Sequence, residues 1–436
     1  MYLFSADRTI LRSRRALSRF ELVESESGVL LWIGDRFTKV TQSARFVSVE
    51  LMRPDVDAHP ICALEWNMDS GIVRQSRSWS GEFGARFCEN PFVIASHAKM
   101  AAAAIAPDVR LWRLRAGSTF EGQAGPGTVS TLTTSKLPMV RRMGYADTVW
   151  EVRRLVMQSV ARCVRDGMAL MLSGGVDSSI LAAAATALGI RIRTFTYALR
   201  RPKRLEQEGT SDRLAATRIA AHLGIPHEVM ELDAQRIRRN VPLGIYLAET
   251  SRSTIVDELA AHIEVARRFY TIGVNCLVTG EGADDLFGAF PSALRYYRGR
   301  ELARFLRHEL VQGLPDELAE LQDVYTPWGI TLVHPYWTAE LRNIGYGLPV
   351  PYRVDRQRLM KRILRDAFAD MLPSDLIERP KGVPRDCAQI RDVLEKRFGQ
   401  SPSRYRPIFR TMMSRRHLWP AGLPPLPRTS KQCAQK

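Results

Sequence analysis

The sequence predicts an α/β protein with a parallel sheet flanked by helices, preceded by a smaller N-terminal α+β module. Short apolar or alternating runs, which suit strands, lie at residues 169–172, 191–199 and 227–232. Segments with apolar residues at helical spacing separate these runs, so strands and helices alternate along the chain. Because a strand–helix–strand order needs crossover connections, the alternation indicates a parallel sheet.

Length and composition limit the class of protein. A chain of 436 residues is long enough for two or three domains, and 45% hydrophobic with 25% charged residues is typical of globular proteins. The formal charge of +17 leaves room for an acidic partner. The arginines are scattered along predicted helices, however, so the sequence favours a solvated basic face.

The cysteines and the N-terminus indicate a cytoplasmic protein with reduced thiols. The six cysteines show no C-x₂-C pairing and no histidine at ligand spacing, so neither a zinc site nor a disulfide framework is expected. Residues 1–15 have no long apolar segment or small-residue cleavage site, and no run of about 18 apolar residues occurs in the chain.

The N-terminal part is predicted from short strands. Residues 28–34 and 46–52 suit strands, and at 90–100 a strand is expected to lead into a helix. No catalytic constellation stands out in this part. The stretch from Gly117 to Pro138 is rich in Gly, Pro, Thr and Ser, which is typical of an exposed connection. We therefore predict a first domain at 1–125, a linker at 126–146 and a second domain at 147–436.

A phosphate-binding loop is predicted at the start of the second domain. The strand at 169–172 is followed by a tight turn, Ser173-Gly174-Gly175, and by an Ala-rich helix from Ser178 onward. Glycines allow backbone N–H groups to face a ligand, and a helix N-terminus adds further free N–H groups. The loop lacks the lysine of a Walker P-loop. Asp177 instead indicates a Mg²⁺ ion shared with a nucleotide pyrophosphate, because a carboxylate repels phosphate unless a cation lies between them.

A second motif, CLVTGEGADDLFG, begins at residue 276. A short strand again ends in a Gly-rich turn, and this turn carries Glu281, Asp284 and Asp285. In a parallel sheet both turns lie at the same edge, so Asp284 could meet Asp177 across the nucleotide as a second magnesium ligand. The alternative is an acidic turn that caps the helix starting near Asp284.

These motifs resemble a known enzyme family. SGGVDSS is similar to the SGGxDSS loop of the PP-loop ATP pyrophosphatases, which cleave ATP between the α and β phosphates. Together with TGEGADDLFG, VHPYWTAELRNIGYGLP and KRILRDAFADMLPSDLIERPKGVP, it resembles the synthetase domain of the asparagine synthetase family over about 147–386. NPFVIASHAKMAAAA and RLRAGSTFE weakly resemble the family's N-terminal, Ntn-like glutaminase module. The resemblance implies a degenerate module of that kind here.

The resemblance implies roles for individual residues and the use of ATP and Mg²⁺. Pyrophosphate would be held by Ser173, Gly174, Gly175, Ser178 and Ser179. Leu172 and Tyr197 would flank adenine and ribose, with Thr279 and Gly280 on the other side of the nucleotide, and Asp177 and Asp284 would bind magnesium. Glu281 would be the general base, and Lys381 would face the charge that develops on phosphate. The alternative for Lys381 is a surface lysine before a glycine turn.

The start of the chain departs from the glutamine-dependent members of that family. Their glutaminase uses a cysteine as the mature first residue, whereas here Met1 is followed by Tyr2 and Cys62 is the first cysteine, so glutamine hydrolysis is not expected. Members without this cysteine include β-lactam-forming synthetases and lasso peptide cyclases. The β-lactam-forming branch resembles a TGYG-type turn with Tyr in place of Glu281, which argues against that chemistry.

The leading hypothesis is therefore a lasso peptide macrolactam synthetase. It would adenylate an Asp or Glu side chain of a ribosomal peptide, release pyrophosphate, and close a ring with the peptide's N-terminal amine as AMP leaves. The expected partners are a precursor peptide, a leader peptidase and a leader-binding protein; neither a membrane nor a nucleic acid is expected. The alternatives are an ammonia-dependent amidotransferase acting on a small acid, a tRNA-modifying PP-loop enzyme suggested by the charge, and a non-catalytic scaffold.

Overall fold

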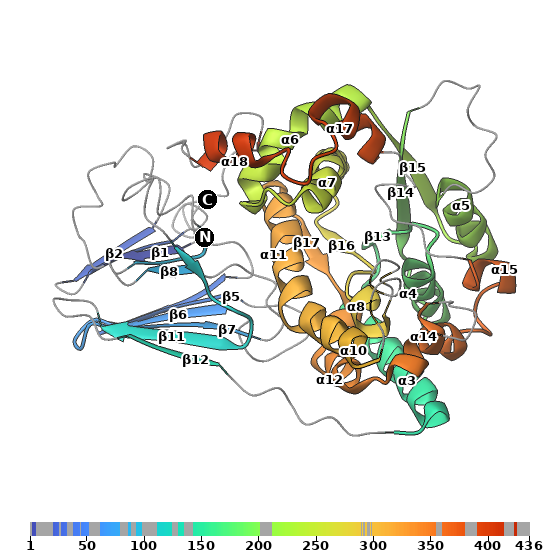
Figure 1. Ribbon diagram of the computed structural model, residues 1–436, viewed down its shortest axis with the longest axis horizontal. Coiled ribbons are helices and arrows are strands. Elements are labelled where there is room, and N and C mark those ends of the chain that lie inside the picture. Colours follow the sequence, from blue (N-terminus) through green and yellow to red (C-terminus); the bar gives the residue numbers. More distant parts are fainter. Residues whose placement is uncertain are drawn as a thin grey trace.

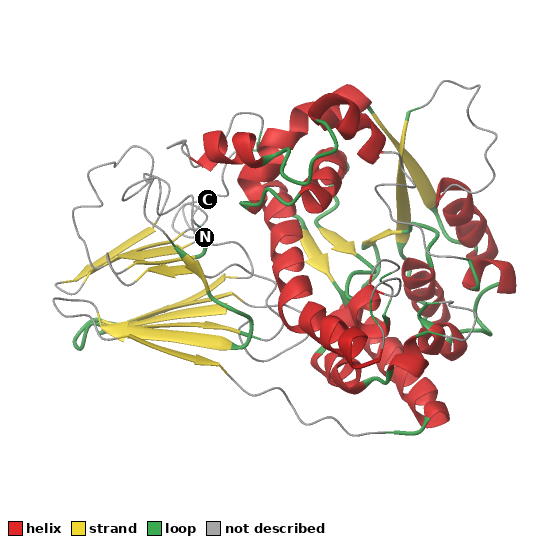
Figure 2. Cartoon of the chain, viewed as in Figure 1, coloured by secondary structure: helices red, strands yellow, loops and turns green. Residues whose placement is uncertain are grey.

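The computed structural model divides into a part made of strands and a larger part made of helices around a sheet (Figures 1 and 2). The residues that it describes are 2–5, 21–25, 28–32, 38–43, 45–51, 62–78, 86–88, 93–97, 111–123, 130–134, 143–200, 212–288, 290, 293, 297, 299–354, 360–379, 390–413 and 423–424.

The described residues of the N-terminal part form two antiparallel sheets of six strands each, seen at the left of Figure 1. The first has the order β10-β8-β9-β1-β3-β2, with β1 (Tyr2–Ser5), β2 (Glu21–Ser25), β3 (Gly28–Trp32), β8 (Arg86–Cys88), β9 (Val93–Ala95) and β10 (Trp112–Arg113). The second has the order β12-β11-β7-β6-β5-β4, with β4 (Thr38–Gln42), β5 (Phe46–Leu51), β6 (Cys62–Asn67), β7 (Ile72–Arg77), β11 (Ser118–Gln123) and β12 (Ser130–Thr134).

A hydrophobic core joins these two sheets. Strand side chains alternate between faces, so one side of each strand can be buried. Val49, Leu64, Trp66 and Phe120 of the second sheet are almost fully buried in one cluster with Ile94 of the first. The strands predicted near 28–34, 46–52 and 93–95 are present; the helix expected to follow lies in residues 98–110, outside the described part of the chain.

Two described strands lie in the stretch whose composition predicts an exposed connection. β11 lies within the Gly- and Thr-rich stretch, yet it pairs with β7 along its whole length and buries Phe120. β12 lies inside the predicted linker 126–146 and pairs with β11 from Ser130 to Thr134. Both strands contain Thr, a β-branched residue that favours strands.

The second part contains a parallel sheet of five strands in the order β15-β14-β13-β16-β17, which confirms the predicted α/β fold. Its strands are β13 (Ala169–Met171), β14 (Arg193–Leu199), β15 (His227–Leu232), β16 (Cys276–Val278) and β17 (Thr331–Val333). Each neighbouring pair is parallel. The crossovers that parallel pairing demands are made by helices.

The helices of this part are α3 (Tyr145–Cys163), α4 (Val176–Ala187), α5 (Asp212–Leu223), α6 (Ala234–Ala248), α7 (Ser253–Thr271), α8 (Ala283–Phe287), α10 (Gly299–His308), α11 (Leu314–Tyr325), α12 (Ala339–Gly347), α13 (Val350–Arg353), α14 (Arg362–Ala367), α15 (Ser374–Ile377), α17 (Ile390–Phe398) and α18 (Arg406–Met413). A π-helical turn spans Glu309–Gly313, and 3₁₀ turns span Thr326–Trp328 and Pro335–Trp337. Among the described residues, no helix has the length and apolar character needed to cross a membrane.

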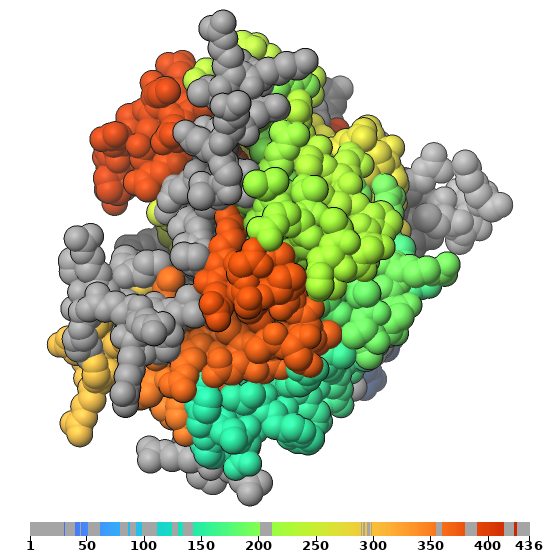
Figure 3. Space-filling model, turned by 90° about the vertical axis from the view of Figure 1, so that its right-hand side faces the viewer, coloured from blue at the N-terminus to red at the C-terminus, as the bar shows by residue number. Residues whose placement is uncertain are grey.

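The helices cover both faces of the parallel sheet. Leu170 and Val278 belong to a core shared with α3, α4, α5, α8, α12 and α14, whereas their neighbours Ala169 and Leu277 belong to a core shared with α6, α7, α17 and α18. This alternation explains the apolar character of these short strands, since both of their faces are buried. Figure 3 shows an outer face where α15 lies beside α5, and Arg218 pairs with Asp375 there at 2.6 Å.

Helix α11 joins the two parts of the molecule. Arg77 Nη1 of β7 lies 3.0 Å from Asp316 Oδ1, and Arg113 Nη1 of β10 lies 2.9 Å from Asp316 Oδ2. A further pair joins Arg86 Nη2 to Glu249 Oε2 at 2.7 Å. The far end of α11 supplies Leu321 and Tyr325 to the cavity described below, so the N-terminal sheets brace one wall of that cavity.

Candidate active site

The phosphate loop lies at the carboxyl end of β13, where ligands bind in open parallel sheets. Ser173 N–H donates to Ser178 Oγ at 3.1 Å, and Gly175 N–H donates to Ser173 Oγ at 3.3 Å. Ser179 Oγ donates to Gly175 O at 2.6 Å. Helix α4 begins at Val176, two residues earlier than predicted, so Asp177 lies in its first turn.

Gly174 lets the loop pack closely against helix α5. Its φ of +73° lies in the left-handed region, and a Cβ there would lie 2.7 Å from Ala215 Cβ and 2.8 Å from Ala216 N. A side chain would therefore be strained by both its backbone angle and its neighbours. The glycine is needed for the close approach of loop and helix.

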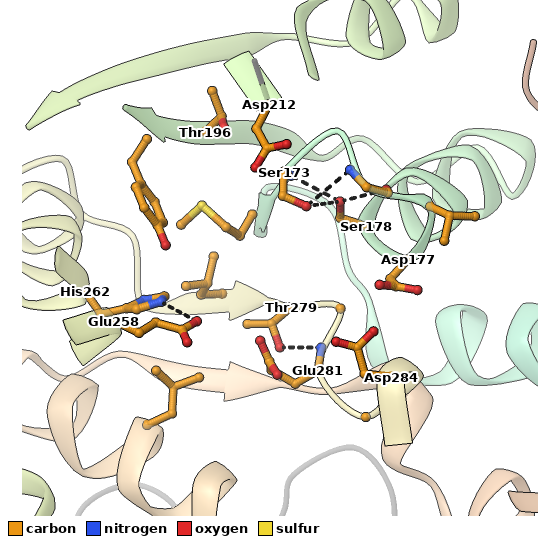
Figure 4. Close-up of a pocket in the computed structure, with 18 of the residues that line it drawn as sticks. Ser173, Asp177, Ser178, Thr196, Asp212, Glu258, His262, Thr279, Glu281 and Asp284 are labelled. Carbon is orange, nitrogen blue, oxygen red and sulfur yellow. Dashed lines mark hydrogen bonds and ion pairs between the residues drawn. The ribbon is translucent and has the colours of Figure 1, made fainter. Parts of the chain in front are cut away.

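The second loop follows β16 and touches the first. A Cβ on Gly280 would lie 3.1 Å from Asp177 Cβ, so the two loops are nearly in contact. Thr279 Oγ1 lies 2.7 Å from His334 Nδ1 and accepts a hydrogen bond from Glu281 N–H at 3.4 Å. These contacts set the direction of the loop that carries Glu281 and Asp284 (Figure 4).

Lys361 brings the two loops together electrostatically. Its buried ammonium group pairs with Asp177, and it lies 2.5 Å from Asp284 Oδ1. Burial lowers the pKa of Lys361, and the neighbouring Asp177 opposes that shift. Lys361 also has φ of +61°, a conformation that non-glycine residues rarely adopt and that often marks a functional site.

The C-terminal segment lies across the phosphate loop. Arg379 Nη1 donates to Gly174 O at 3.0 Å, and its Nη2 lies 2.8 Å from Asp212 Oδ1. Arg365 Nη2 in turn donates to Arg379 O at 3.1 Å. The predicted Lys381 follows two residues later, outside the described residues, so its role stays a prediction.

Most of the predicted site residues line one cavity, which they share with residues that the sequence analysis did not single out. The predicted ones are Ser173, Gly175, Asp177, Ser178, Tyr197, Thr279, Gly280, Glu281 and Asp284. The additional ones include Met171, Thr196, Asp212, Glu258, His262, Leu321, Tyr325, Lys361, Arg365 and Arg379.

Three predicted nucleotide-binding residues do not line the cavity. The side chain of Leu172 is fully buried in the core, so only its main chain could face a nucleotide, and Met171 takes the cavity side of the strand. Gly174 packs against α5, and Ser179 Oγ is bonded to the backbone of Gly175. Asp285 is also buried away from the cavity, and burial raises its pKa well above the usual range.

The far end of the cavity is formed by α7 and α11. His262 Nδ1 lies 2.6 Å from the hydroxyl of Tyr325, and His262 Nε2 lies 3.6 Å from Glu258 Oε1. Burial raises the pKa of Tyr197 and Tyr325 well above their usual range, and the charges of Glu258 and Glu281 raise both further. The sequence signal for this group is only a Glu and a His four residues apart on a helix.

The phosphate-loop side of the cavity carries three cations, Lys361, Arg365 and Arg379, together with the carboxylates Asp177, Asp212 and Asp284. Glu258 and Glu281 point into the space beyond the loop (Figure 4). The cations can attract phosphate oxygens, and the two glutamates can attract a cation.

Residues 151–326 and 299–422 of the chain match the family model for asparagine synthase. The chain belongs to the asparagine synthase family. A glutamine-hydrolysing asparagine synthetase of Asparagus officinalis is 25% identical over 265 residues, covering 56% of this chain and 41% of that protein. A carboxyethyl-arginine β-lactam synthase of Streptomyces clavuligerus is 26% identical over 275 residues, covering 62% of this chain and 51% of that protein.

The asparagine synthase family relatives are ATP-dependent carbon–nitrogen ligases, with a β-lactam synthase among them. The chain spans about half or less of the length of the two curated relatives, at 41% and 51%. Among solved structures, an NH₃-dependent NAD synthetase from Campylobacter jejuni is similar with a TM-score of 0.23 and 17% identity, covering 38% of this chain and 76% of that one.

Proposed function

We propose that the protein is an ATP-dependent amide synthetase that adenylates a carboxylate and couples it to an amine, releasing pyrophosphate and AMP. The observation that carries this proposal is the single cavity in which the phosphate loop and the carboxylate of Glu281 face the same space. Adenylation needs the phosphate loop, and removal of a proton from the attacking amine needs the carboxylate.

The donor set fits Mg²⁺ bound between protein and nucleotide. Among the described residues no group of three or more His, Cys, Asp or Glu could hold a metal, but Mg²⁺ is commonly held by one or two carboxylates plus substrate phosphates. Asp177 Oδ1 is buried and has no hydrogen-bond partner among the described residues. Asp177 and Asp284 would therefore hold the ion, which would neutralise phosphate charge when bound.

The chain's own residues account for the remaining needs of adenylation. Backbone N–H groups of the loop around Gly175 and the start of α4 would bind phosphate oxygens. Lys361 and Arg379 would offset the negative charge that gathers when a carboxylate approaches the α-phosphate. Glu281 would then take a proton from the amine.

We infer that the substrate is a ribosomal peptide and the product a lasso peptide macrolactam. A ring-forming β-lactam synthase among the relatives supports an amine and a carboxylate from one molecule. The resemblance described above implies Tyr in that branch at the position of Glu281, and such a difference would separate the two chemistries. A leader peptidase and a leader-binding protein are the partners that such a reaction requires.

The test is reconstitution with ATP, Mg²⁺, the precursor peptide encoded nearest the gene, and its leader peptidase. We expect a peptide product lighter by one water and AMP in equal amount. Formation of ADP in place of AMP would contradict adenylation.

A second candidate is an ammonia-dependent amidotransferase that converts the carboxylate of aspartate or another small acid to a primary amide. The acidic far end of the cavity favours it, because ammonium is a small cation. A primary amide made from ammonium gives a product mass different from that of a ring closed by loss of water. A tRNA-modifying activity would instead require RNA binding that weakens steeply with salt.

A further inference from the structure

Amide formation from a protonated amine releases two protons. The ammonium nitrogen loses one proton before it attacks the acyl carbon and the other after the C–N bond forms. The C–O bond to AMP breaks, and AMP leaves with that electron pair. Glu281 accounts for one proton only. A second acceptor must lie near the nitrogen, or water in the cavity must take the proton.

Glu258 lies in the same cavity as Glu281, on a different element. It projects from α7, and 27% of its side chain is exposed, while the neighbouring His262 side chain is only 9% exposed. Because Glu258 lines the cavity, its exposed part faces the cavity (Figure 4). Both carboxylates act electrostatically on the same two phenols, Tyr197 and Tyr325, so they share one local environment.

His262 and Tyr325 hold Glu258 in place. The hydroxyl of Tyr325 stays protonated because burial raises its pKa, and it can donate to His262 Nδ1 at 2.6 Å. A hydrogen on His262 Nε2 would then face Glu258 Oε1, 3.6 Å away. In the opposite tautomer a lone pair would face the carboxylate. With the hydrogen on Nε2, the contact with Tyr325 and the contact with Glu258 are both favourable.

The walls around Glu258 also suit an ammonium group. Tyr325 lines the cavity there, and its ring lies 5.6 Å from the ring of His262. An aromatic ring beside a carboxylate can add to the binding of an ammonium ion.

We propose that Glu258 binds the ammonium group of the attacking amine and accepts one of its two protons, and that His262, anchored by Tyr325, positions Glu258. This proposal rests on the proposed function. It assigns the nucleophile as an amine that enters protonated on the side of the cavity lined by α7 and α11 and meets the acyl carbon of the adenylate from that side.

Binding gives the first test. The probes are the leaderless core peptide with a free N-terminus and the same peptide N-acetylated, titrated by calorimetry with Mg²⁺ and α,β-methylene ATP present. We expect the free amine to bind about 10- to 100-fold tighter, as charge-assisted hydrogen bonds allow, and Glu258→Gln to abolish the difference. A Glu258→Gln variant that keeps the full preference would overturn the proposal.

Catalysis gives the second test, with hydroxylamine as a nucleophile that is unprotonated at neutral pH. Glu258→Gln should keep ATP–pyrophosphate exchange and hydroxamate formation while amide formation falls by about 10²-fold or more. His262→Leu should lower the rate of amide formation in the same way. His262→Gln, which retains a hydrogen-bond donor, should recover part of that rate. Glu264→Gln is the matched control, because Glu264 is buried on the same helix and does not line the cavity.

The outcomes separate the proposal from the function on which it rests. If the parent enzyme performs exchange but makes no amide from peptide or ammonium, the proposed function fails and the assignment of Glu258 fails with it. If the parent makes amide and Glu258→Gln makes it equally fast, only the assignment fails. Should Glu258→Gln not fold, Glu258→Asp takes its place, and an unchanged amide rate in that variant contradicts the proposal.

Discussion

At the residue scale, Lys361 explains how two aspartates can face each other before a nucleotide binds. A single ammonium group, almost completely buried, contacts both Asp177 and Asp284. Removing one member of a buried ion group leaves an uncompensated charge inside the protein. That charge destabilises the fold by more than the intact group stabilises it. Lys361 therefore holds together the two carboxylates that we propose as magnesium ligands when no metal ion is bound.

We predict that Lys361→Met lowers the free energy of unfolding by about 3–5 kcal/mol in metal-free buffer, because the two carboxylates are left facing each other. Added Mg²⁺ should raise the melting temperature of this variant more than that of the parent, since a cation can replace the ammonium group. Lys396→Met, at an exposed position of α17, is the control. Equal Mg²⁺ responses in all three proteins would show that Lys361 does not hold the site.

Our proposal assigns Asp177 to the adenylation step. Asp177→Ala should abolish ATP–pyrophosphate exchange, because loss of a magnesium ligand removes several kcal/mol of transition-state stabilisation, on the order of what a catalytic metal supplies. The control is Asp375→Ala, whose carboxylate pairs with Arg218 on the surface. Substantial exchange by Asp177→Ala would show that the metal assignment is wrong.

At the element scale, α11 links the cavity to the N-terminal sheets and carries a titrating carboxyl group. Burial is the main cause that raises the pKa of Glu317 to about 7, and the charges of Glu258, Glu320 and Glu309 add to it. A carboxyl whose pKa is raised on folding binds protons more tightly in the folded state. Its stabilising contribution is complete below its ordinary pKa and is lost as pH rises through about 7.

Glu317→Gln should therefore raise the melting temperature more at about pH 9 than at about pH 5. The gain should be modest, because 40% of the Glu317 side chain is exposed and Arg252 lies 3.3 Å from it. The measurement is the melting temperature of variant and parent across this pH range. A gain confined to acidic pH would contradict the assigned direction of the pKa shift.

Local elements were predictable from the sequence, whereas contacts between distant segments were not. The strand, turn and helix around Ser173 follow from neighbouring residues, and so does the turn that carries Glu281. Lys361 meets Asp177 across 184 positions, and no local pattern encodes that pairing. Glu258 and His262 look like an ordinary helical pair until the fold places them in the cavity. For β11, composition gave the wrong expectation because burial of Phe120 is set by its partner strand.

At the scale of the whole molecule, buried ion pairs join the N-terminal sheets to the second part. Arg77 is almost completely buried, and it donates to Leu114 O at 2.8 Å and Pro315 O at 3.2 Å besides pairing with Asp316. Burial lowers the pKa of Arg77, and Asp316 opposes that shift. This side chain satisfies groups from both parts of the molecule.

Arg77→Met should lower the free energy of unfolding by on the order of 3 kcal/mol, because two buried carbonyls lose their donor while Asp316 keeps Arg113. Arg74 lies on the same strand as Arg77 and forms an exposed ion pair with Glu121. Arg74→Ala should lower the free energy of unfolding by about 1 kcal/mol or less. Chemical denaturation of the three proteins provides the comparison. Equal losses in the two variants would contradict the bracing role of Arg77.

The central claim is that adenylation and amine attack take place in one cavity and that Glu281 serves only the second step. A time course with Glu281→Gln that records pyrophosphate exchange, AMP and amide product together tests it most directly. We expect exchange to continue while amide formation slows by about 10²- to 10⁴-fold, with AMP released by hydrolysis in place of product. Loss of exchange, or amide formation at the parent rate, would contradict the claim.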